Sequence, residues 1–176
     1  IEKVLDGLAT PPQYFPKNAM MNKGGYDSID VVLDHARRAL DPEHVSKLMK
    51  DGALLLDTRE HMLFQKEYIP GSVNIGLDGN FASWVGTLIE DINQPIVLIV
   101  EEERIDEAII RLARVGYNNT VGYLQGCVKE WKDSGYPTDS IEAVSAYTLN
   151  KMLGEGKDLN IIDTRRNSEY QSEHVL

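Results

Sequence analysis

Short apolar segments alternate with predicted helices along most of the chain. The apolar segments are typical of strands that are buried on both faces of a parallel sheet, and they lie at 53–56, 96–100 and 120–124. A further short strand is predicted at 72–75. Helices, which bury one apolar face, are predicted at 28–39, 41–51, 81–89, 105–113 and 128–134. This alternation predicts an α/β fold with a parallel sheet and helices on both faces.

Single residues support several of these predicted elements. Asp41 and Pro42 suit the N-cap and the first position of a helix, and Gly52 suits the left-handed residue at the end of that helix. Trp84 and Trp131 lie on predicted helices. We expect both tryptophans to anchor the core, as lone aromatics on helix faces usually do.

The stretch from Pro95 to Gly116 is the predicted centre of any active site. Its strand, Ile96–Val100, runs directly into an amphipathic helix, so backbone N–H groups and the positive end of the helix dipole converge on the loop between them. That loop holds Glu101, Glu102 and Glu103, and neither a nucleophile nor a glycine-rich cradle. We interpret the glutamates as first-turn carboxylates that complement the dipole. A metal or general-base site would lack a nearby histidine in the sequence.

An internal repeat is the strongest signal of domain organisation. The segment Leu54–Arg59 (LLLDTR) recurs 106 residues later as Asn160–Arg165 (NIIDTR). At the same offset an aromatic residue and a Glu–aromatic–aliphatic triplet also recur. We therefore predict one complete domain at 28–138 and the opening part of a second copy at 141–176, with its first strand at 160–162.

Neither end of the chain looks like a domain boundary. Residues 1–27 are predicted to be the end of a preceding domain followed by a linker, because Pro and Gly interrupt any regular pattern there. The second copy is too short to bury an apolar face by itself. We therefore expect the sequence to lie within a longer protein that includes the rest of both flanking domains.

Several blocks of the sequence resemble the rhodanese family. They are LLLDTRE, EYIPGSVNIGL, PIVLIV and RLARVGYNNTVGYLQGCVKEWKDSGYP, and together they cover 42–137. The resemblance implies a parallel five-stranded sheet with flanking helices, followed here by the start of a second copy. The segment GLATPPQYFPKNAMMNKGG resembles the connection between a metallo-β-lactamase domain and rhodanese repeats in fusion proteins. Those fusions include relatives of persulfide dioxygenases and hydroxyacylglutathione hydrolases.

The resemblance also indicates where the catalytic group should lie. Active rhodaneses place a cysteine directly after the central strand, where its thiolate carries the transferred sulfur. That position falls on Val100 or Glu101, and neither can carry sulfur. We therefore predict a degenerate, inactive loop, which comprises Val100, Glu101, Glu102, Glu103, Arg104 and Ile105.

Two D-x-R segments, each at the end of a predicted strand, match a segment that is typical of the family. By resemblance, Asp57 braces neighbouring loops and Arg59 lies near the pocket rim, so we predict a structural role for both. Asp163 and Arg165 are the equivalent pair in the second copy. Cys127, the single cysteine, stands where the family usually has glycine, and we predict a structural role for it as well.

Composition and charge limit the classes of partner and cofactor that we expect. The net charge of −10 disfavours nucleic acid and anionic membranes, and no apolar run reaches the roughly 20 residues of a membrane span. A single cysteine suits a reducing, cytoplasmic compartment. The four histidines are scattered without metal-binding spacing. We therefore expect no cofactor in this segment and place any zinc or iron in the preceding metallo-β-lactamase domain.

The favoured hypothesis is an inactive rhodanese-like module of a metallo-β-lactamase–rhodanese fusion in sulfur or thiol metabolism. Its expected partners are the remaining domains of that protein, and homo-oligomer formation stays open. Two alternatives remain. One is an enzyme, either a sulfurtransferase that uses Cys127 or a hydrolase whose activity belongs to the parent protein. The other is an interaction domain whose acidic loop meets a basic partner.

Overall fold

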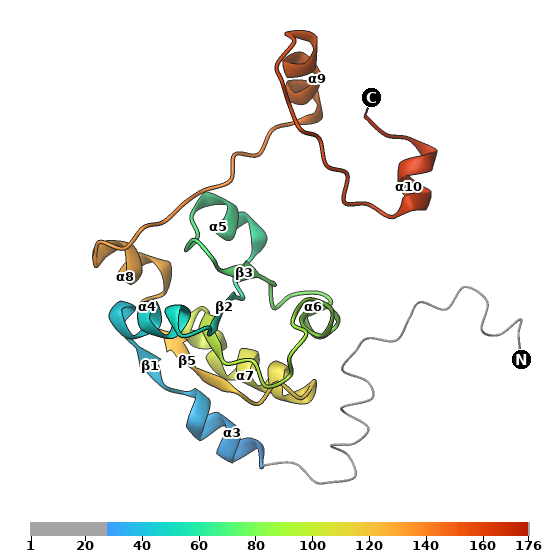
Figure 1. Ribbon diagram of the computed structural model, residues 1–176. Coiled ribbons are helices and arrows are strands. Elements are labelled where there is room, and N and C mark those ends of the chain that lie inside the picture. The colour runs from blue at the N-terminus through green and yellow to red at the C-terminus, as the bar shows by residue number, and fades with distance from the viewer. Residues whose placement is uncertain (1–27, 176) are drawn as a thin grey trace, which may run out of the picture. The chain divides into compact units, whose positions relative to one another are not determined.

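The computed structural model describes residues 28–175, which fall into two units with their boundary after Ile141 (Figure 1). The predicted helix end and linker at 1–27 lie outside the described residues. Each unit is considered separately below. Among the described residues, no helix is long and apolar enough to cross a membrane.

The first unit is built around a five-stranded sheet in which every strand pair is parallel. The strand order is β1-β5-β4-β2-β3, which confirms the predicted parallel α/β fold. The strands are β1 (Ala39–Leu40), β2 (Leu54–Asp57), β3 (Val73–Asn74), β4 (Ile96–Ile99) and β5 (Thr120–Leu124). Residues 28–39 do not form one helix as predicted, because the helix ends at Ala36 and the edge strand β1 follows.

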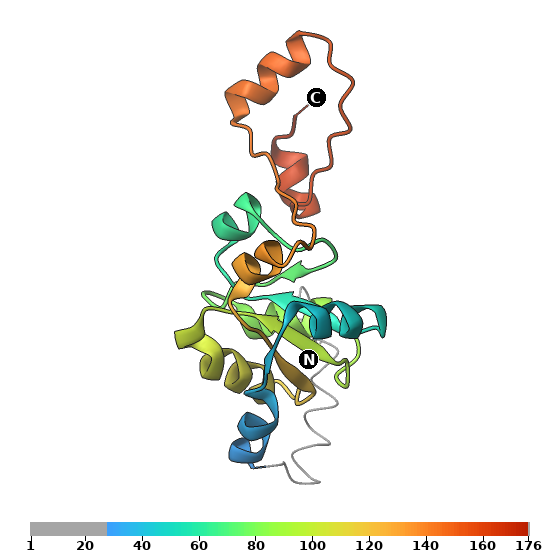
Figure 2. The ribbon, with the colours of Figure 1, turned by 90° about the vertical axis from the view of Figure 1, so that its left-hand side faces the viewer.

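Helices cover both faces of this sheet (Figure 2). They are α3 (Ile29–Ala36), α4 (Pro42–Lys50), α5 (His61–Lys66), α6 (Phe81–Leu88), α7 (Ile105–Arg114) and α8 (Cys127–Asp133). Side chains from α3, α6 and α7 pack in one core cluster. Side chains from α4 and α8 pack in a second cluster.

Alternation along the central strand explains how the two clusters form. Ile96, Leu98 and Val100 belong to the cluster under α3, α6 and α7, whereas Val97 and Ile99 belong to the cluster under α4 and α8. Successive side chains of a strand point to opposite faces. A continuous apolar run is therefore what a strand covered on both faces requires.

The predicted helix signals of α4 are confirmed. The Asp41 side chain accepts a hydrogen bond from the His44 backbone N–H at 2.8 Å, and Pro42 occupies the first turn. Gly52 has a φ of 94°, which is the left-handed conformation that glycine adopts without steric cost.

Only one of the two tryptophans anchors the core. Trp131 is 4% exposed, and its indole N–H donates to the Pro137 carbonyl at 2.9 Å. Trp84 is 56% exposed, so the prediction for it is wrong. The inward positions of α6 are taken by Phe81 and Val85, and Trp84 falls on the outer face.

The second unit contains two helices, α9 (Ala146–Gly154) and α10 (Asn167–Ser172). The strand predicted at 160–162 is absent, because these residues pair with no neighbouring strand among the described residues. Ile162, which aligns with the buried Leu56 of β2, is 83% exposed. A strand in a parallel sheet depends on its neighbours for its hydrogen bonds, and the described part of the chain offers this segment no such neighbour.

Candidate functional site

The candidate site lies at the carboxyl end of β4, where the chain turns into α7. Val100 follows the strand and is 3% exposed, with its side chain in the core. Glu101, Glu102 and Glu103 are exposed. Of the two positions considered for the nucleophile, one is therefore an apolar core residue and the other an exposed carboxylate.

The three glutamates do not lie in the first turn of α7. Glu102 and Glu103 lie in a separate 3-10 turn, η1 (Glu102–Arg104), and Glu101 precedes it. The Glu101 carbonyl accepts a hydrogen bond from the Arg104 backbone N–H at 2.9 Å. The acidic residues of the first turn of α7 are instead Asp106 and Glu107. The predicted dipole role thus applies to residues one turn further along.

Arg104 is the cation of this loop, and two carboxylates hold it. Its Nε donates to Glu107 at 2.8 Å, and its two Nη atoms donate to Asp78 at 3.1 and 3.0 Å. These bonds, first to Glu107 and then to Asp78, raise the pKa of Arg104. Arg104 in turn lowers the pKa of both Asp78 and Glu107. The guanidinium is therefore already paired and is not held open for an anionic substrate.

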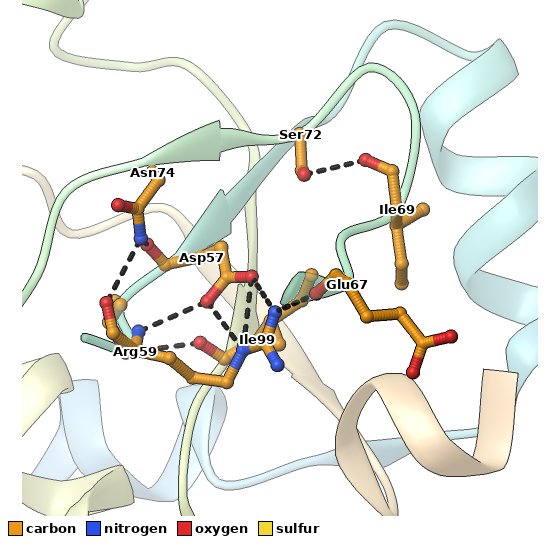
Figure 3. Close-up of polar contacts among 8 residues, drawn as sticks. Asp57, Arg59, Glu67, Ile69, Ser72, Asn74 and Ile99 are labelled. Carbon is orange, nitrogen blue, oxygen red and sulfur yellow. Dashed lines mark hydrogen bonds and ion pairs between the residues drawn. The ribbon is translucent and has the colours of Figure 1, made fainter. Parts of the chain in front are cut away.

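The Asp57–Arg59 pair forms a buried corner at the carboxyl end of β2 (Figure 3). The Asp57 carboxylate accepts the Arg59 backbone N–H at 3.0 Å and the guanidinium at 2.6–3.1 Å. The guanidinium also donates to the Glu67 carbonyl at 2.9 Å. Burial would lower the pKa of Arg59, but the hydrogen bonds and charge of Asp57 outweigh it and raise that pKa.

Two residues that the sequence did not single out complete this corner. The Asn74 side chain donates to the carbonyls of Asp57 and Arg59, both at 3.0 Å, and Thr58 donates its hydroxyl to the Ile99 carbonyl at 3.0 Å. Asn74 is a polar residue within the strand predicted at 72–75, which is the signal that could have found it. These contacts tie the carboxyl end of β2 to β3 and β4.

Cys127 lies at the same edge of the sheet. It follows β5 at the start of α8, and the charges of Arg59, Asp57 and Glu101 act on the pKa of its thiol. Burial is the largest influence and raises the pKa of the thiol. Its φ of 56° is the one positive value at a non-glycine position among the described residues, as expected where glycine is usual.

Comparison with known proteins identifies the family to which this domain belongs. The model of the rhodanese-like domain matches residues 41–134, more than half of the chain. The chain belongs to the rhodanese-like domain family. A comparison with curated proteins gives no match.

Solved structures agree with the rhodanese-like fold. The Alr3790 protein from Anabaena superposes with a TM-score of 0.52 at 18% identity, and the match covers 64% of this chain and 99% of that one. A metallo-β-lactamase from Staphylococcus aureus superposes with a TM-score of 0.55 at 22% identity, and the match covers 69% of this chain and 32% of that one. At these identities the likeness shows the fold.

The second unit reproduces the corner of the rhodanese-like domain. The Arg165 guanidinium donates to Asp163 at 2.6–3.1 Å and to the Glu173 carbonyl at 2.8 Å. The aromatic rings also recur, since Phe64 stacks on Tyr68 with centroids 4.7 Å apart and Tyr170 stacks on His174 with centroids 4.1 Å apart. Each contact occurs at the offset of the sequence repeat.

The described residues supply no metal site. Across residues 28–175, no group of three or more His, Cys, Asp and Glu side chains is placed to hold an ion.

Proposed function

We propose that this chain is a catalytically inactive rhodanese-like module of a larger protein of sulfur or thiol metabolism. The observation that carries the proposal is the content of the loop after β4, where Val100 is buried in the core and Glu101, Glu102 and Glu103 follow. Sulfur transfer needs a thiolate nucleophile at this position, and the loop has none.

Charge works against an anionic donor in the same loop. At about 5 Å, like charges repel by roughly 1–3 kcal/mol at intermediate dielectric. The one guanidinium of the loop, Arg104, is already bonded to Glu107 and Asp78. Thiosulfate or a persulfide anion would therefore meet exposed carboxylates without a free cation to offset them.

Cys127 is a poor substitute for the absent nucleophile. Burial raises the pKa of its thiol, and Asp57 and Glu101 raise it further. Because the thiolate is the reactive form, a raised pKa leaves less of it at neutral pH. A hydrogen bond from the Val128 backbone N–H and the charge of Arg59 oppose this shift, but burial is the larger influence and the Arg59 guanidinium is bonded to Asp57.

The larger protein that we propose is a metallo-β-lactamase–rhodanese fusion related to persulfide dioxygenases and hydroxyacylglutathione hydrolases. A chain described as a metallo-β-lactamase contains a stretch of this fold that makes up 32% of its length, which supports the proposal. The recurrence of the corner in Asp163 and Arg165 supports a second rhodanese-like copy from residue 141 onward. In that protein the metal would belong to the metallo-β-lactamase domain.

Cyanide-dependent turnover of thiosulfate tests the proposed inactivity. We expect the chain to stay at the background rate, and Cys127→Ala to leave that rate unchanged. An active rhodanese is assayed in parallel as a control that the reagents work. Robust turnover by the chain that disappears in Cys127→Ala would overturn the proposal and make Cys127 the nucleophile.

A further inference from the structure

A cavity of about 440 Å³ lies beside α6 and outside the loop discussed above. Its walls include Trp84 and Leu88 from α6, Glu60 and His61 at the start of α5, and Asp78 and Asn80 from the segment before α6. Neither the fold nor the proposed loss of sulfur transfer accounts for this combination of an exposed indole and carboxylates.

The apolar wall of the cavity is unusually exposed. Trp84 is 56% exposed and Leu88 is 53% exposed. The two residues are four positions apart on α6 and therefore lie on the same face of the helix. Exposed apolar residues gathered in a concave site often mark an interaction surface, and tryptophan is enriched among the residues that dominate such surfaces.

The polar wall is acidic. The Asp78 side chain is 82% exposed even though Arg104 contacts it at 3.0 Å, so its carboxylate can accept further hydrogen bonds. The Glu60 side chain makes no hydrogen bond or ion pair with any residue that the structure describes. None of the residues that line the cavity is Lys or Arg.

We propose that this cavity docks a basic segment of a partner protein, with an arginine or lysine side chain stacked on the Trp84 indole. A cation over an indole face is attracted by the ring quadrupole, and the aliphatic stem of the same side chain can lie along Leu88. Glu60 and Asp78 then receive its charged head. The net charge of the whole chain, −10, favours the encounter with a basic partner. The inference goes beyond the proposed function, because it uses residues other than the nucleophile position.

Binding of a fluorescein-labelled peptide of alternating arginine and glycine, followed by fluorescence anisotropy at low salt, tests this site. We expect saturable binding by the 176-residue chain. We expect Trp84→Leu, which keeps an apolar side chain but removes the ring, to weaken binding about fivefold. Glu60→Gln should weaken it about two- to threefold. Circular dichroism should show both variants folded, because both side chains are exposed.

Matched controls separate this site from general attraction to an acidic protein. Glu130 is another exposed glutamate, its charge acts on the neighbouring Lys129 and not on the cavity, and Glu130→Gln should leave binding unchanged. Equal weakening by Glu130→Gln and Glu60→Gln would overturn the proposal, as would equal binding of a peptide in which glutamine replaces arginine. Sedimentation that shows a dimer lost in Trp84→Leu would instead assign the surface to a second copy. Turnover of thiosulfate is measured separately, so the two proposals can fail independently.

Discussion

The same corner is built twice in this chain, once buried and once exposed. In the first unit the side chains of Arg59 and Asp57 are 10% and 0% exposed. In the second unit those of Arg165 and Asp163 are 46% and 21% exposed. Yet both arginines contact their aspartates at 2.6 Å and donate to the carbonyl eight residues later at 2.9 and 2.8 Å.

The comparison separates what the local sequence encodes from what the sheet adds. The D-x-R segment and the short helix after it suffice for the ion pair and the carbonyl contact, because both form in the second unit without a strand. Burial comes from elsewhere in the chain. In the first unit Asn74 and the Ile99 carbonyl fix the corner to the neighbouring strands.

Removing the carboxylate of the buried corner should have the largest effect. Asp57→Ala leaves the guanidinium of Arg59 without its charged partner, and breaking a buried pair in this way costs about 3–5 kcal/mol. We expect that loss in the free energy of unfolding of the first unit, measured by urea titration of tryptophan fluorescence, since both tryptophans lie in that unit and Trp131 lies in its core. Asp57→Asn, which keeps a hydrogen-bond acceptor, should lose less.

The matched change in the exposed corner sharpens the comparison. Asp163→Ala should leave the urea midpoint of the first unit unchanged and alter amide exchange in α10 only slightly, since exposed ion pairs contribute little. If Asp57→Ala were as harmless as Asp163→Ala, the buried corner would not brace the domain and the difference in burial would have no energetic meaning.

The exposed corner should be visible in a smaller, electrostatic effect. Hydrogen bonds from the side chain and backbone of Arg165 lower the pKa of Asp163 from 3.8 to about 2. Because the folded-state pKa is depressed, the pairing stabilises the corner above the usual pKa and is lost as the pH falls through about 2.

A carboxyl-carbon NMR titration measures this shift. Arg165→Gln should move the pKa of Asp163 back toward 3.8, whereas Lys157→Gln, which removes an exposed cation elsewhere in the second unit, should not. Titration of Asp163 near its usual value in the unsubstituted chain would show that the exposed corner is not formed.

The sequence predicted the elements whose signals are local or strictly periodic. The apolar run of β4 and the amphipathic face of α7 are examples, since burial on two faces and on one face leave distinct patterns. Asp41 and Gly52 also took their predicted places. The repeat could be recognised in the sequence because the residues that form the D-x-R corner lie close together along the chain.

Features that depend on neighbours were missed. The two-residue edge strand β1 exists only because it pairs with β5, whereas the segment 160–162 is not a strand, since nothing within residues 28–175 pairs with it. Trp84 is of a residue type that usually packs in a core, but its exposure depends on which face of α6 meets the sheet. Asn74 acts through carbonyls 15 and 17 residues away in the sequence.

The central proposal is that this chain does not accept sulfur, either at the loop after β4 or at Cys127. Incubation with thiosulfate, followed by the mass of the intact protein, measures this most directly, with an active rhodanese treated in parallel. We predict no added mass on this chain. The account would be contradicted if the unsubstituted chain gained the mass of one sulfur atom and cyanide released that sulfur as thiocyanate, while Cys127→Ala gained no mass.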